Sequence, residues 1–150
     1  MWLTEQEIEE FIRDFEACRL PKVRWTHDAH LLVGLWYLTH HSPDDALSLV
    51  RQRIRAHNEA VGTGNTARRG YHETLTRFFL RGIAAHLDAH RGKSLPACFA
   101  ALRQSPLARK DWPLRFYTPE RLFSAEARAG WLEPDVVALL PDMEKEKFSP

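Results

Sequence analysis

The segment that decides the fold runs from Trp25 to His41 and reads WTHDAHLLVGLWYLTHH. Thr26 is a typical N-cap residue, and the apolar residues after it lie on nearly every side of a helix. A helix that is apolar all round is a central one, because neighbouring helices must cover most of its faces. Its first turn also carries His27 and His30, which share a face because they are three residues apart. We therefore expect a buried helix with two imidazoles at its N-terminal end.

Capping signals and apolar spacing predict further helices on both sides of this segment. A Thr-x-x-Glu capping box opens a helix at residues 5–18, and a Ser-Pro-Asp-Asp start opens another at residues 43–61. A periodic apolar stripe predicts a fourth long helix at residues 71–90. Shorter helices are expected at residues 95–102 and from residue 118 into residues 125–129.

These helices, with no strand pattern, predict an all-α fold in which an up-and-down four-helix bundle core carries a C-terminal helical extension. We expect residues 1–140 to form a single helical domain and residues 141–150, which alternate acid and lysine, to form a solvated tail.

Composition restricts the classes of partner. The chain has 150 residues, and 21 Lys+Arg against 20 Asp+Glu leave a formal charge of +1, which is no electrostatic footprint for nucleic acid or an anionic membrane. The longest apolar run is far shorter than the roughly 20 residues that span a bilayer. The 2 cysteines form no CxxC pair, and no signal peptide precedes the first helix. We expect a cytoplasmic protein without a nucleic-acid or membrane partner, and the sequence leaves its oligomeric state open.

The 8 histidines all lie between residues 27 and 90. If the helices run up and down, the N-terminal ends of the second and fourth helices share one end of the bundle, which brings His72 to His27 and His30. Three imidazoles are typical of an open catalytic zinc site, and nickel, copper and iron also accept imidazole. We therefore expect these three residues to bind a divalent transition metal, with zinc as the first choice.

The residues around His72 suggest the other parts of such a site. Glu73 is the candidate for proton transfer. Arg69 lies just before a helix N-terminus, where it could hold an anionic substrate, and Tyr71 could line the pocket. Together these residues predict a small metal-dependent enzyme, a hydrolase or transferase that acts on a small-molecule substrate. The alternative is a non-catalytic helical module for ligand binding or protein interaction, with structural histidines and a solvated loop arginine.

A second histidine pair, His86 and His90, has the i, i+4 spacing common among metal ligands on helices. It lies near a helix C-terminus, where the dipole favours imidazolium, so ordinary helix-end capping is the alternative interpretation.

Three phrases, at residues 25–31, 70–74 and 116–124, resemble those of a family of small bacterial helical proteins, a likeness that implies no particular activity. More loosely, three helix-borne histidines in a four-helix core are similar to the DinB/YfiT-like metalloproteins. That resemblance implies a nickel or zinc ion and a reaction on thiols or small metabolites. In those proteins a late i, i+4 pair acts with one earlier histidine, which implies His86 and His90 as an alternative ligand pair.

Overall fold

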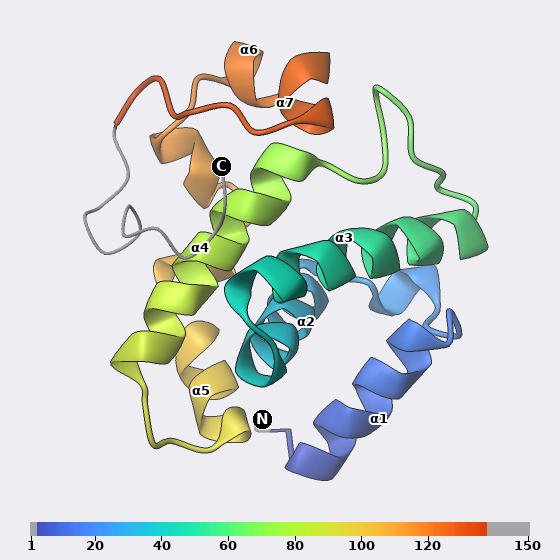
Figure 1. Ribbon diagram of the computed structural model, residues 1–150, viewed down its shortest axis with the longest axis vertical. Coiled ribbons are helices and arrows are strands. Elements are labelled where there is room, and N and C mark those ends of the chain that lie inside the picture. The colour runs from blue at the N-terminus through green and yellow to red at the C-terminus, as the bar shows by residue number, and fades with distance from the viewer. Residues whose placement is uncertain (1–2, 138–150) are drawn as a thin grey trace.

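The computed structural model describes residues 3–137, and within this range every regular element is a helix (Figure 1). The α-helices are α1 (Glu5–Glu16), α2 (His27–His40), α3 (Pro43–Ala60), α4 (Glu73–Ala89), α5 (Leu95–Leu102), α6 (Pro119–Leu122) and α7 (Ala125–Ala129). Three short 3₁₀ turns are η1 (Lys22–Arg24), η2 (Pro106–Ala108) and η3 (Trp112–Arg115). The all-α prediction is confirmed. The predicted tail at residues 141–150 lies outside the described residues.

Side-chain caps fix where the first three long helices begin. The hydroxyl groups of Thr4, Thr26 and Ser42 each accept a hydrogen bond from the main-chain N–H three residues on, and the Thr4 cap is a complete capping box. These starts agree with the sequence prediction. The predicted end of α1 is wrong by two residues, because Cys18 has φ 57°, in the left-handed region where a helix does not continue.

Helix α4 begins later than the sequence predicted. Its first residue is Glu73 rather than Tyr71, because His72 adopts an extended conformation with φ −133° and ψ 108° and serves as the N-cap. The Nδ1 atom of His72 accepts a hydrogen bond from the N–H of Leu75 at 3.1 Å. His72 therefore takes the place that Ser or Thr fills in the other long helices.

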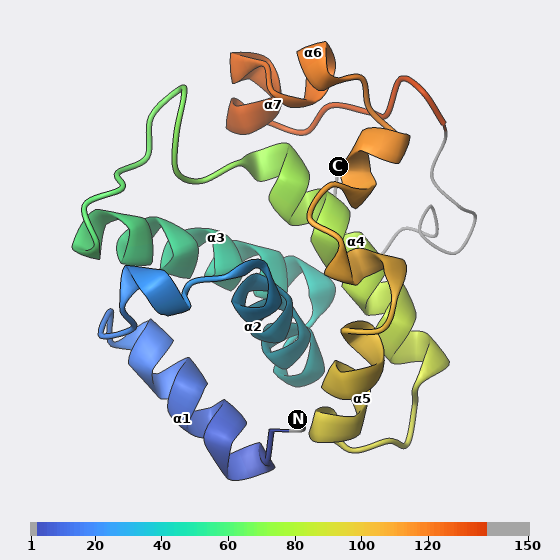
Figure 2. The same cartoon turned by 180° about the vertical axis from the view of Figure 1, so that it is seen from behind.

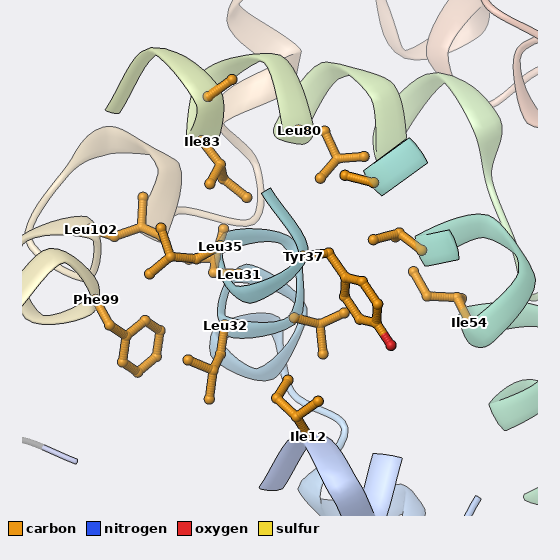
Figure 3. Close-up of a cluster of buried hydrophobic side chains, with 14 of the residues drawn as sticks. Ile12, Leu31, Leu32, Leu35, Tyr37, Ile54, Leu80, Ile83, Phe99 and Leu102 are labelled. Carbon is orange, nitrogen blue, oxygen red and sulfur yellow. The ribbon is translucent and has the colours of Figure 1, made fainter. Parts of the chain in front are cut away.

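Helix α2 is the centre of the hydrophobic core, as predicted. Figure 3 shows its Leu31, Leu32 and Leu35 surrounded by side chains from α1, α3, α4 and α5. At Gly34 the helix passes so close to α4 that an added Cβ would lie 2.8 Å from Cδ1 of Ile83. A side chain at this crossing would therefore force the ends of the Ile83 and Leu80 side chains to shift.

The arrangement of the helices around α2 does not confirm an up-and-down four-helix bundle. Helix α5 packs against α1, α2 and α4, so the core draws on a fifth helix that the sequence analysis assigned to the extension. In both overall views α4 lies obliquely to α3 (Figures 1 and 2). Within the described residues, no helix is long and apolar enough to cross a membrane.

The C-terminal extension has a small core of its own. Phe78 on α4 packs with Phe116, Tyr117 and Leu122, and α7 contacts α4 beside them. The extension therefore covers the N-terminal half of α4, where the predicted site residues begin.

Candidate functional site: a cavity between α2, α3 and α4

A cavity of about 530 Å³ lies among α2, α3 and α4. This volume is within the range of small-molecule sites. Its floor is apolar and buried, and four of the floor residues appear in Figure 3: Leu31, Ile54, Leu80 and Ile83. The exposed residues of the wall are Lys22, Thr26, His30 and Lys110, so the mouth of the cavity lies where η1 leads into α2.

Four of the six predicted site residues line this one cavity: His27, His30, Tyr71 and His72. The N-terminal ends of α2 and α4 do meet there, which is the placement that the argument from helix direction required. The other two residues are not part of the wall. Arg69 is exposed in the loop between α3 and α4, and the carboxylate of Glu73 is bound elsewhere.

The rings of His27 and His30 are each bound to a main-chain carbonyl. Nε2 of His27 lies 2.8 Å from the oxygen of Leu107, and Nδ1 of His30 lies 2.7 Å from the oxygen of Thr26. A carbonyl oxygen only accepts, so these ring nitrogens carry the hydrogen and donate it. The remaining nitrogens, Nδ1 of His27 and Nε2 of His30, have no hydrogen bond among the described residues.

His72 uses both of its ring nitrogens. Besides the cap to Leu75, its Nε2 lies 2.8 Å from the oxygen of Leu122 and donates to it. Burial lowers the pKa of His72, which favours the neutral ring that the cap requires. His72 could bind a metal ion only by giving up one of these two bonds.

No group of three or more His, Cys, Asp or Glu side chains in the described part of the chain is placed to hold a metal ion. The three-histidine metal site remains a prediction, and the contacts of His72 do not fit it.

Glu73 is an ionised carboxylate in a partly buried ion pair. Nε and Nη2 of Arg51 donate to its two oxygens at 2.9 and 2.6 Å, and the hydroxyl group of Tyr71 donates at 2.7 Å. Burial by itself would raise the pKa of Glu73, but the hydrogen bonds and the charges of Arg51 and Arg77 lower it. A carboxylate bound in this way ties α3 to α4, and proton transfer by Glu73 remains an untested prediction.

The loop between α3 and α4 is held in shape by Asn65, which the sequence analysis did not single out. Its Oδ1 accepts hydrogen bonds from Nδ2 of Asn58 and from the N–H of Tyr71, both at 3.0 Å. Gly70 closes the loop with φ 85°, and a Cβ there would lie 2.0 Å from the oxygen of Gly64. The two flanking glycines were the available signal, because they predict a turn that some polar side chain must hold.

Aromatic rings pack tightly at the mouth. The ring of Trp25 stacks on Phe15 at 4.9 Å, and its centroid lies 3.9 Å from that of His30 and 5.0 Å from that of the buried His57. This enclosure lowers the pKa of His30, and the charge of nearby Lys110 lowers it further. Part of the His30 side chain remains exposed at the mouth.

The second histidine pair is bound to main-chain groups as well. Nε2 of His86 lies 3.0 Å from the oxygen of Cys98, and Nδ1 of His90 lies 2.8 Å from the oxygen of His86. The His90 contact agrees with the capping interpretation, whereas His86 joins α4 to α5. Burial lowers the pKa of His86, the opposite of the direction expected from the helix dipole.

Comparison with protein-family models, with curated proteins and with solved structures finds no match to this chain.

Proposed function

We propose that this protein binds a small molecule in the cavity between α2, α3 and α4. The observation that supports this proposal is the cavity itself, about 530 Å³ of space that opens to solvent at one end and has a floor of buried apolar side chains. Its volume and its mostly apolar lining are typical of a small-molecule site. Four residues that were predicted from the sequence as site residues lie in its wall: His27, His30, Tyr71 and His72.

The inner wall favours a ligand with an apolar body. Several of its polar groups are already hydrogen-bonded within the protein: both ring nitrogens of His72, the hydroxyl group of Tyr71 and the amide nitrogen of Asn58. A ligand that offered polar groups there would lose its bonds to water and gain few in return. Burial of apolar ligand surface, at about 25 cal/mol per Å², supplies the binding free energy.

The proposal is tested by calorimetric titration with 1-octanol, an uncharged probe with an apolar chain. We expect saturable binding of one molecule per chain. The variant Thr63→Trp, which places an indole in the cavity wall, should weaken or abolish it.

The matched control is Ala67→Trp, which adds the same indole to an exposed position of the same loop and should bind octanol as the unchanged protein does. Circular dichroism establishes that both variants fold. Thr76→Leu is a second variant that changes a residue of the cavity wall. Absence of saturable binding, or equal binding by both tryptophan variants, contradicts the proposal.

A metal-dependent enzyme is the second candidate. It is favoured by Nδ1 of His27 and Nε2 of His30, which belong to wall residues and have no hydrogen bond in the described part of the chain. A metal bound there would be held by these two residues with ligands from water or substrate, and His72 would keep its cap.

Metal analysis of protein purified without a polyhistidine tag tests this candidate. One equivalent of zinc, nickel, copper or iron that is lost in His30→Ala supports it. Substoichiometric metal in the native protein, unchanged in His30→Ala, contradicts it.

A further inference from the structure

Two lysines that lie far apart in the sequence are found at the mouth of the cavity. Lys22 lies in η1 and Lys110 lies between η2 and η3, and both are exposed members of the wall. The residues of the wall include no aspartate and no glutamate. The cavity therefore opens under positive charge alone.

The acids near the mouth are already paired with other cations. Asp28 lies 3.2 Å from Nε of Arg103, and Asp111 lies 3.3 Å from Nε of Arg109. Lys22 and Lys110 form no ion pair with any carboxylate among residues 3–137. Their charges are therefore not neutralised locally, and they favour an anion at the mouth.

Two of the wall histidines, His30 and His72, add no charge of their own. Burial and the nearby cations lower the pKa of His30, and burial lowers the pKa of His72, so both rings are neutral at pH 7. The two lysine side chains place positive charge at the mouth, while the floor of the cavity presents apolar groups and the hydroxyl group of Tyr71 and the ring of His72 are already hydrogen-bonded.

We propose that the ligand is an anionic amphiphile, with one ionised acid group at the mouth beside Lys22 and Lys110 and an apolar body against the inner wall. This inference rests on the proposed function, because it names the class of molecule that the same cavity binds. A cation would meet two like charges at the mouth, and a neutral ligand would gain nothing from them.

The experiment compares four probes of equal chain length by calorimetry: octanoate, octanesulfonate, 1-octanol and octylammonium. We expect octanoate to bind more tightly than octanol and octylammonium to bind least. Added salt should weaken the binding of octanoate and leave that of octanol unchanged. If octanesulfonate and octanoate bind with equal affinity, the mouth recognises negative charge alone. If octanoate binds more tightly than octanesulfonate, the mouth recognises a carboxylate.

Lysine variants assign the effect to the mouth. Lys22→Gln and Lys110→Gln should each weaken octanoate binding by about two- to fivefold, the range of a solvent-exposed ion pair, without changing octanol binding. Lys93→Gln is the matched control, an exposed lysine outside this wall.

Octanol binding as tight as octanoate binding, or unchanged octanoate affinity in both lysine variants, overturns this inference and leaves the cavity as a binding site for neutral molecules. Failure of all four probes to bind overturns the proposed function as well.

Discussion

The ion pair between Glu73 and Arg51 offers the sharpest test of how this site is built. We expect Glu73→Gln to destabilise the fold although the two side chains have nearly the same shape. Glutamine cannot accept all three hydrogen bonds that Arg51 and Tyr71 donate, and Arg77, 4.0 Å away and 8% exposed, loses the negative charge of Glu73.

The magnitude follows from the burial of the pair. Breaking a fully buried ion pair costs about 3–5 kcal/mol. The side chain of Arg51 remains 38% exposed, so water compensates part of the loss and we expect about 2–3 kcal/mol. The sign of the pH dependence is also fixed. The folded pKa of Glu73 is below its unfolded value of 4.5, so the difference between native protein and variant is constant above pH 4.5 and shrinks as the pH falls through the folded pKa.

Urea denaturation followed by circular dichroism measures this difference. Glu9→Gln is the control, an exposed glutamate in α1 whose loss should change the unfolding free energy by less than about 0.5 kcal/mol. A change of that small size in Glu73→Gln as well would refute the structural role of the carboxylate. It would return Glu73 to the list of groups available for chemistry.

Three further predictions concern the same region. His72→Ala should cost about 2 kcal/mol in unfolding free energy, because it removes an N-cap and a buried hydrogen bond. His72→Asn should lose only about half as much, because asparagine keeps the cap. Equal losses for the two variants in thermal or urea unfolding would contradict separate contributions from the cap and the hydrogen bond. Stability should fall as the pH is lowered below 6.5, because folding lowers the pKa values of His30, His72 and His86 and the unfolded chain then binds more protons. Urea midpoints measured from pH 7.5 to 5 test this. A stability that rose on acidification would count against neutral imidazole rings. Gly70→Ala should destabilise the protein by more than the cost of a left-handed backbone, about 1–2 kcal/mol, because its Cβ would collide with a main-chain oxygen. Gly130→Ala is the control and should be neutral, because Gly130 has an extended backbone and open space around it. Similar melting temperatures for the two variants would refute the close packing of the loop at Gly70.

The helical elements could be predicted because their signals are local. Thr4, Thr26 and Ser42 cap helices where short-range rules place them, and the all-round apolar character of α2 predicted its central position. The start of α4 was missed because histidine is an uncommon cap, and its role depends on the carbonyl of Leu122, fifty residues further along the chain. The bundle was assumed from short loops, which determine connections but not which helices fill the remaining faces of α2.

The candidate site was predictable in its location and not in its bonding. Helix direction brought His27, His30 and His72 to one cavity. No short-range pattern, however, relates His27 to Leu107 or Glu73 to Arg51, and these distant partners decide which nitrogens and oxygens remain for a ligand. The lysines at the mouth were missed for the same reason, since Lys22 and Lys110 come to the same cavity only in the folded chain.

The most direct test of small-molecule binding in the cavity is a crystal structure of the protein with 8-bromooctanoate, in which anomalous scattering locates the bromine atom. The account predicts a bromine peak inside the cavity, beside Leu31, Leu80 and Ile83, with the carboxylate toward Lys22 and Lys110. A cavity without bromine in crystals that hold the ligand on the outer surface of the protein would contradict it.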